Sequence, residues 1–332
     1  MISKILNKIF SSPKFINLII FCLIVSIFTN LVHKIHEKID VKSNNNNFSL
    51  KEKVSIKFSS EDTYSYILDR SCEIKGDMHD RHKVRWIKSL FLKNVYQKAF
   101  EIKNTLPYYL NIFIHSLLIF LTLLILNKTY KLEKYYTLLF LLYVTFLFSN
   151  YLGEYSYSIF EMFFLSGALY FSKKNKIIPF TLLCILAVLN RESGFIILLT
   201  WFIFNNNIQK FIYAGIATIL IFLFLNWDII NCLINPKFFI PLEDQKGQIN
   251  AIDLLNMNFF SVMKLVFISF GLPFGIIIYY VSKTENKNII LILITFIYLL
   301  VFLFAVPMHH VAVRMLVLPL IFTSVYFYKL KD

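Results

Sequence analysis

Ten apolar stretches run through this chain, separated mostly by short polar connections. A helix needs ~20 apolar residues to cross a bilayer core about 30 Å thick. Backbone groups in lipid must be satisfied within the protein, and barrel strands are short and alternate in polarity, so long uninterrupted runs predict helices. The expected spans are 15–33, 107–127, 135–150, 156–172, 177–190, 195–209, 211–227, 259–282, 288–306 and 311–328.

The sequence therefore predicts an all-α integral membrane protein of about ten transmembrane helices, with a long first extracytoplasmic loop that carries interfacial helices. A hydrophobic share of 57% agrees with this class. The expected parts are a cytoplasmic N-terminal segment with the first transmembrane helix (1–33), the first extracytoplasmic loop with its amphipathic interfacial helix (34–106), transmembrane helices two to seven (107–227), a second extracytoplasmic loop (228–258) and transmembrane helices eight to ten (259–332).

The lysines of the short connections predict the orientation of these spans. Cytoplasmic loops carry an excess of Lys and Arg, and long loops are left out of that rule. A cytoplasmic N-terminus puts fourteen lysines on the cytoplasmic side, and the short outer segments then hold only Arg191, Lys237 and Lys246. We expect a multi-pass protein of the inner (plasma) membrane with both termini in the cytoplasm.

The formal charge of +14 fits the same interpretation, because lysines that border apolar spans meet anionic membrane lipids. Membrane lipids are therefore expected partners, and nucleic acid is not. The orientation depends on whether 177–209 crosses the membrane twice. We favour a hairpin with Arg191 and Glu192 at the outer surface over one long helix or a re-entrant pair.

The second half of the first loop predicts an amphipathic helix. Apolar side chains recur there at helical spacing, and the lysines lie mostly off that stripe. Such a helix rests in the membrane interface with its lysines outward. The apolar residues are Trp86, Ile87, Leu90, Phe91, Val95, Tyr96 and Phe100, and the lysines are Lys88, Lys93, Lys98 and Lys103.

Charged residues cluster just before that helix, from Gly76 to Arg85. On a helix, Asp77, Asp80 or Arg81, and Arg85 would share one face. A carboxylate beside arginines suits a substrate with a hydroxyl to deprotonate and a phosphate to hold, since the guanidinium fork matches phosphate oxygens. The alternative is an ordinary helix stabilised by salt bridges.

Two further basic groups fall on the predicted outer side. Arg191 and Glu192 lie in Leu189-Asn190-Arg191-Glu192-Ser193, where ionisable residues at a membrane edge point to function. The alternative is that Arg191 reaches the interface and pairs with Glu192. Arg314 enters an apolar span and shares a helix face with His310, and no acidic residue follows in the next turn, which favours an external anion.

Several supporting features are less specific. His309 and His310 are adjacent but lack a third ligand at a defined spacing, so no metal site is predicted. Glu154 faces outward between the third and fourth spans and is more typical of a structural role, as are Glu61 and Asp62. Charges are nearly absent at mid-membrane depth, with Lys264 as the main exception.

Because the three basic clusters share one side, the sequence predicts a single outward-facing site. This arrangement resembles the GT-C class of integral membrane glycosyltransferases. The segment from Asp77 to Arg85 looks like the acidic residue and arginines of that family's first outer loop. The Asn190-Arg191-Glu192-Ser193 turn is similar to an Asn-Arg-Glu-Thr/Ser turn of bacterial members, and Arg314 with Pro319 looks like the arginine of their last spans.

The resemblance implies transfer of a sugar from a polyprenyl-phosphate carrier to a glycan or lipid acceptor at the outer face of the inner membrane. It implies Asp77 or Asp80 as the catalytic base and Arg81, Arg85, Arg191 and Arg314 as phosphate-binding residues. Glu192, His309, His310 and Glu154 are supporting residues. No specific cofactor is predicted, although a divalent cation could assist.

This sequence also departs from the family. Its acidic residue lies well beyond the first span, which leaves Glu61 and Asp62 as rivals to Asp77. The alternatives in function are a polysaccharide polymerase of the O-antigen type and a lipid-glycan flippase or exporter. The scarcity of charge at mid-membrane depth argues against the exporter.

Overall fold

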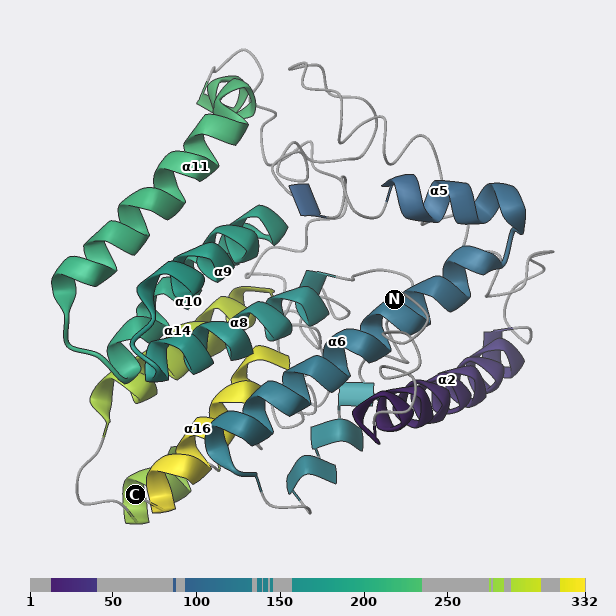
Figure 1. Ribbon diagram of the computed structural model, residues 1–332, viewed down its shortest axis with the longest axis horizontal. Coiled ribbons are helices and arrows are strands. Elements are labelled where there is room, and N and C mark those ends of the chain that lie inside the picture. The colour runs from purple at the N-terminus through teal and green to yellow at the C-terminus, as the bar shows by residue number, and fades with distance from the viewer. Residues whose placement is uncertain are drawn as a thin grey trace, which may run out of the picture.

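In a computed structural model the chain folds as a bundle of helices (Figure 1). The structure describes residues 13–40, 86–87, 93–132, 136–145 without 139 and 143, 157–234, 275–283 without 276, 288–305 and 317–331. Every regular element within these ranges is helical, which agrees with the predicted all-α class. The elements are α2 (Pro13–Asp40), α5 (Lys93–Ile102), α6 (Leu106–Tyr130), α8 (Tyr157–Lys173), α9 (Ile177–Asn190), η3 (Glu192–Gly194), α10 (Phe195–Leu198), η4 (Leu199–Ile203), α11 (Ile208–Ile234), α14 (Ile289–Ala305) and α16 (Val317–Lys331).

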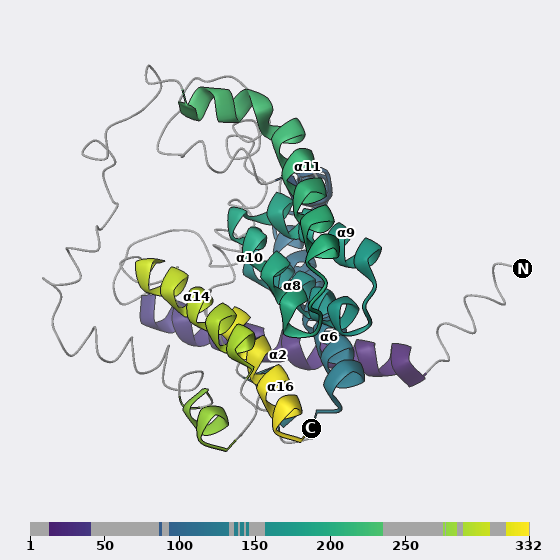
Figure 2. The same ribbon diagram turned by 90° about the vertical axis from the view of Figure 1, so that its left-hand side faces the viewer.

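Helix α8 lies at the centre of the bundle, between α6 and α9 and against α16. Helices α2 and α11 lie on opposite flanks, α2 against α6 and α11 against α9 (Figures 1 and 2). The interior is apolar and fully buried around Met162 and Leu165 of α8 and Phe180 of α9. The Phe180 ring packs on Trp201 with 5.0 Å between centroids. This packing fixes α8 as the helix against which the other segments are positioned.

Several helices share one end, which we call the lysine end. Lys173 at the end of α8 donates from Nζ to the Thr129 carbonyl of α6 at 2.8 Å and lies over the Tyr328 ring of α16. Lys210 at the start of α11 donates to the Asn175 side chain at 3.1 Å. Helices α6, α8 and α16 therefore end where α9 and α11 begin, as the predicted alternation requires.

Asparagine side chains mark helix starts at this end. The Asn207 side-chain oxygen accepts from the Lys210 backbone N–H at 3.0 Å and caps α11, and Asn288 caps α14 through the Leu291 N–H at 2.9 Å. Such caps satisfy backbone donors that have no partner within the helix. Asn288 also donates to the Ile203 carbonyl at 3.2 Å, which places the start of α14 beside the end of η4.

The segment 177–203 doubles back on itself, as the predicted hairpin requires. Helix α9 matches its predicted bounds and is about 21 Å long at 1.5 Å per residue. The return limb differs from the prediction. A continuous helix over 195–209 was expected, and that prediction was wrong. The limb consists of η3, α10 and η4 and ends at Ile203. Because 3₁₀ turns rise about 2 Å per residue, these twelve residues also cover about 22 Å.

Two described helices are long and apolar enough to cross a membrane, namely α6 and residues Ile208–Asn231 of α11. Shorter apolar helices occupy Ile16–Leu31, Ile177–Asn190 and Ile289–Tyr298. Of the roughly ten predicted spans, two are therefore helices that meet both the length and the hydropathy of a membrane span within the described part of the chain. The predicted spans 135–150, 259–282 and 311–328 fall partly or largely outside the described residues.

The predicted amphipathic helix of the first loop is present in part as α5. Tyr96 and Ala99 are buried against α6, whereas Lys98 is exposed. The Tyr96 hydroxyl donates to the Asn111 side chain of α6 at 3.0 Å. Helical residues Trp86 and Ile87 precede α5, and the Trp86 indole N–H donates to Asn226 of α11 at 2.8 Å.

Candidate functional site

The candidate site begins with Glu161, a carboxylate in the second turn of α8. It follows Ile159 and Phe160 and precedes Met162, so it is the one acidic side chain in an apolar run. Helix packing directs it inward, and its side chain is fully buried. An isolated buried carboxylate is strongly disfavoured, which means that Glu161 requires a positive or hydrogen-bonding partner.

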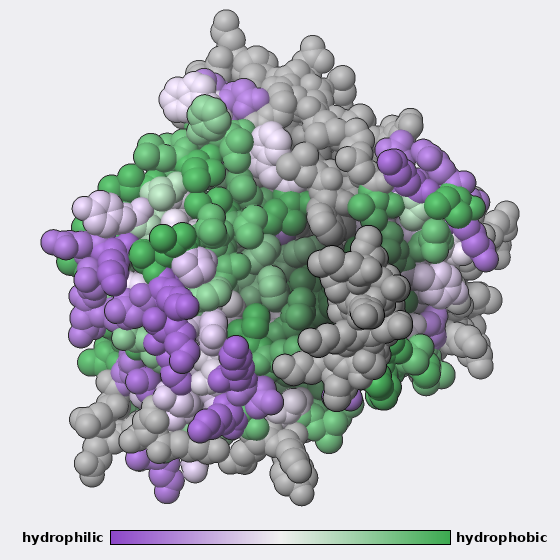
Figure 3. All heavy atoms as spheres, in the orientation of Figure 1, coloured by the Kyte–Doolittle hydropathy of each residue, from purple (hydrophilic) through white to green (hydrophobic). Residues whose placement is uncertain are grey.

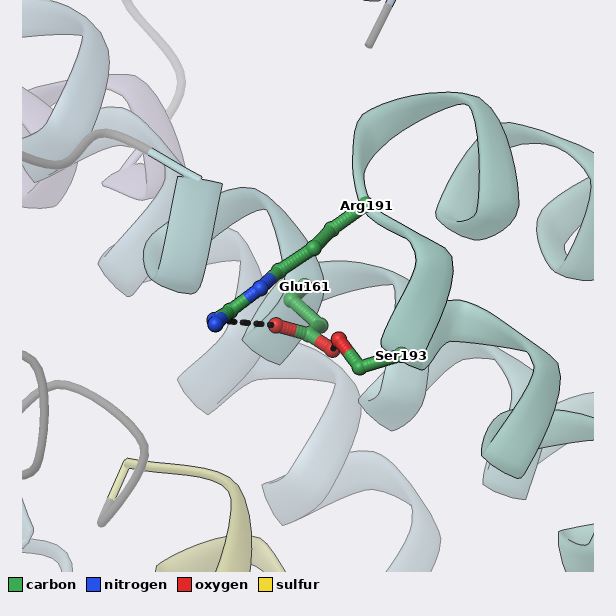
Figure 4. A network of polar contacts seen from close by, with 3 residues as sticks. All are labelled: Glu161, Arg191 and Ser193. Atoms are coloured by element: carbon green, nitrogen blue, oxygen red, sulfur yellow. Dashed lines mark hydrogen bonds and ion pairs between the residues drawn. The ribbon is translucent and has the colours of Figure 1, made fainter. Parts of the chain in front are cut away.

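Arg191 supplies that positive charge from the turn that follows α9 (Figure 4). Its backbone is extended, with φ −165° and ψ 146°, and its N–H still bonds to the Ala187 carbonyl. The helix therefore stops at Asn190, and the arginine side chain turns toward α8. The guanidinium Nη1 lies 3.8 Å from Glu161 Oε2, and the Arg191 side chain is 13% exposed.

Ser193 completes the site from the same turn. Its hydroxyl donates to Glu161 Oε1 at 2.5 Å, so arginine and serine approach different oxygens of one carboxylate (Figure 4). Gly194 follows and packs directly on the α9 backbone, where an added Cβ would lie 2.4 Å from the Ala187 carbonyl carbon. This close approach holds the turn against α9 and thereby positions both side chains.

The guanidinium N–H donors have no hydrogen-bond acceptor among the described residues. Arginine carries five N–H donors, and a separation of 3.8 Å is an ion pair without a hydrogen bond. Within the described part of the chain, the Arg191 side chain makes no hydrogen bond. A poorly solvated, charged donor fork of this kind is suited to bind an oxyanion, with Glu161 fixing its direction.

Arg191 pairs with Glu161, thirty positions earlier, a residue that the sequence analysis did not single out. The Glu192 side chain and Lys264 lie outside the described residues, so the roles predicted for them stay predictions. A single acidic residue in the apolar run Ile159–Phe164 was the available signal, because such residues mark functional positions.

The site lies far from the lysine end. Glu161 and Lys173 are twelve residues apart on α8, which corresponds to about 18 Å along the helix axis. Arg191 follows α9, which starts at the lysine end and runs away from it. This agrees with the prediction that Arg191 and the connecting lysines face opposite ends of the bundle.

The remaining predicted site residues lie outside the described residues. These are Asp77, Asp80, Arg81, Arg85, Glu154, His309, His310 and Arg314. The backbone of Glu192 is described as part of η3, but its side chain is not. Among the residues that the structure describes, no group of three His, Cys, Asp or Glu side chains could hold a metal ion.

A second buried polar group lies on α6 and was missed in the sequence. His115 is 1% exposed, and its Nδ1 lies 2.7 Å from the Asn111 carbonyl. The Asn111 side chain in turn accepts from Tyr96. At the same end of α6, Tyr108 donates to the Asn30 side chain of α2 at 3.2 Å. These contacts join α2, α5 and α6, which favours a structural role for the group.

No protein-family model, curated protein or solved structure matches this chain.

Proposed function

We propose that this chain is an integral membrane glycosyltransferase that moves a sugar from a polyprenyl-phosphate carrier to a glycan or lipid acceptor at the outer face of a bacterial inner membrane. The observation that carries the proposal is the Arg191 guanidinium. It is 13% exposed, it is oriented by buried Glu161, and it makes no hydrogen bond with the described residues. A donor fork held in this way is suited to a phosphate group.

A membrane location is supported by the surface of α11. Phe224 is 84% exposed, Tyr213 is 71% exposed and Trp227 is 60% exposed. Only 11% of the apolar stretch of α11 is buried, whereas 50% of the apolar stretch of α6 is buried. An apolar surface of this extent is unfavourable in water but matches lipid tails. Together with the apolar spans of the sequence, it supports a multi-pass membrane protein.

The proposed reaction is a displacement at the anomeric carbon of the sugar. The acceptor hydroxyl oxygen forms the new bond, the bond from the sugar to phosphate breaks, and the polyprenyl phosphate leaves with the bonding electrons. Asp77 or Asp80 accepts the hydroxyl proton. Arg191, with Arg81, Arg85 and Arg314, binds the phosphate and stabilises the negative charge that develops on it.

Glu161 has a separate role in this proposal. It is buried behind Arg191 and bonded to Ser193, so we assign it as a positioning residue that does not touch the phosphate. Its charge keeps the guanidinium in one orientation before the substrate arrives. Pre-positioned charged donors contribute more to the transition state than donors that must reorganise.

Substitution of Arg191 tests the proposal. In cells that make the chain's glycan product, Arg191→Ala should abolish glycan assembly, and Arg191→Lys should retain only part of it because lysine lacks the guanidinium fork. Asp77→Asn and Asp80→Asn identify the base. Lys98→Ala, which replaces an exposed lysine of α5, is the matched control and should leave assembly unchanged. Full assembly in Arg191→Ala, at wild-type amounts in the membrane, would contradict the proposal.

Product analysis distinguishes a transferase from a polymerase. Loss of a single-sugar transferase leaves an intermediate that lacks one sugar, whereas loss of a polymerase leaves complete single repeat units. Mass spectrometry of the lipid-linked intermediates in a deletion strain measures this difference directly. Accumulation of complete single repeat units would contradict transfer of a single sugar and would indicate a polymerase instead.

A further inference from the structure

The lysines of the lysine end fall into two structurally different groups. Lys128, Lys173 and Lys329 lie over the rings of Tyr170, Tyr328 and Phe204, respectively. Lys173 also donates to the Thr129 carbonyl. These three cations hold the helix ends together, since a cation over an aromatic face is attracted by the ring.

The lysines of the second group make no such contact within the described part of the bundle. Lys131 follows α6, and Lys174 and Lys176 lie in the turn between α8 and α9. All three side chains are exposed, and they make no hydrogen bond or ion pair with residues of the described ranges. The described residues around them, 128–132, 170–178 and 203–213, contain no Asp or Glu. Their positive charge is therefore not neutralised by the described parts of this end.

Exposed apolar side chains border these lysines. Ile178 of α9 is 72% exposed, Ile208 of α11 is 60% exposed, and Tyr213 one turn further is 71% exposed. Figure 3 shows the hydrophilic patch directly beside a hydrophobic surface, on the side where α11 begins in Figure 1. A charged rim next to an apolar face is the pattern that meets headgroups and acyl chains together.

We infer that Lys131, Lys174 and Lys176 form a binding surface for the headgroups of anionic phospholipids. The inference rests on the proposed membrane location but is independent of glycosyl transfer. A lysine near an anionic lipid surface contributes roughly fivefold in affinity. Three lysines on one surface should therefore select anionic over zwitterionic lipids.

Native mass spectrometry of the detergent-extracted full chain tests this surface. Dioleoyl phosphatidylglycerol or dioleoyl phosphatidylcholine is added, and the bound lipid is counted. The wild-type chain should prefer phosphatidylglycerol. In the triple variant Lys131→Gln, Lys174→Gln, Lys176→Gln, the ratio of phosphatidylglycerol to phosphatidylcholine binding should fall by at least about tenfold. Added salt should weaken it as well, because exposed charges are screened.

Two control variants make the result specific. Replacing the same three lysines by arginine should preserve the preference, because the charge is kept. Lys98→Gln with Lys103→Gln, in and beside α5, should also preserve it. An unchanged preference in the glutamine triple variant, or an equal loss in the α5 control, would overturn the inference. Competition by inorganic phosphate at equal concentration would assign the surface to free phosphate instead of lipid.

The experiment separates this inference from the proposed function. Equal binding of both lipids by a chain that is extracted from membranes and assembles glycan would refute only the lipid surface. A chain recovered without membranes would refute the membrane location, and the inference with it.

Discussion

An added Cβ on Gly194 would lie 2.4 Å from the carbonyl carbon of Ala187 and 2.5 Å from the Val188 nitrogen. Real Cβ atoms essentially never approach backbone this closely, so α9 and the turn that carries Arg191 would have to separate. The absence of a side chain at this position is therefore what allows the hairpin to close.

Gly194→Ala is expected to lower the free energy of unfolding by at least about 2 kcal/mol, because rigid backbone cannot relieve the overlap. Gly215→Ala is the matched control. Gly215 lies in α11 with nothing within 4 Å of the added Cβ, and alanine should stabilise that helix by about 0.5–1 kcal/mol. Denaturant unfolding in detergent measures both variants. Equal stability of the two would show that the turn does not pack on α9.

Glu161 and Arg191 are expected to be energetically coupled. Glu161→Leu leaves the guanidinium without its buried counter-charge and should cost roughly 3 kcal/mol of stability. Arg191→Leu removes the positive charge 3.8 Å from the buried carboxylate and should cost a similar amount. The double variant should be more stable than the sum of these losses by at least about 1 kcal/mol. Strict additivity in this cycle would indicate that the two side chains do not interact.

Lys173 is expected to stabilise the bundle, whereas its neighbour Lys174 is not. Lys173→Gln removes a hydrogen bond to Thr129 and the cation at 3.5 Å from the Tyr328 ring centroid. The expected loss is about 1–3 kcal/mol. Lys174→Gln, an adjacent and exposed residue, should change stability by less than about 0.5 kcal/mol. Thermal unfolding of both variants in the same detergent provides the comparison. A smaller effect at Lys173 than at Lys174 would contradict the assigned contacts.

The sequence predicted the helical class and the hairpin because both depend on local signals. Apolar run length and flanking lysines placed α9 at 177–190, whereas the return limb was predicted to run to residue 209 and instead ends at Ile203. The 3₁₀ geometry of η4 was not predictable from those signals, since it follows from tertiary contacts. The Asn205 side chain donates to the Ser172 carbonyl at 2.7 Å and to its hydroxyl at 3.1 Å. These bonds fix where the limb must end.

The partner of Arg191 was not identified from the sequence for a similar reason. Glu192 is adjacent in the sequence and was therefore the expected counter-charge, but its side chain lies outside the described part of the structure. Glu161 lies thirty positions away, and only the packing of α8 on α9 brings it to 3.8 Å. Of the predicted site, the structure describes the Arg191 side chain and the backbone of Glu192. The positions of Asp77, Asp80 and Arg314 relative to Arg191 stay a prediction.

Cysteine labelling tests the central claim, that Arg191 belongs to an outward-facing anion site that also includes Asp77 and Arg314. Single cysteines at 77, 191 and 314, and at 174 and 210 of the lysine end, are introduced into a chain without its native cysteines. A membrane-impermeant maleimide should label the first three in intact cells and the other two only after lysis. Labelling of residue 191 on the same side as residue 174, or opposite to residues 77 and 314, would contradict the account.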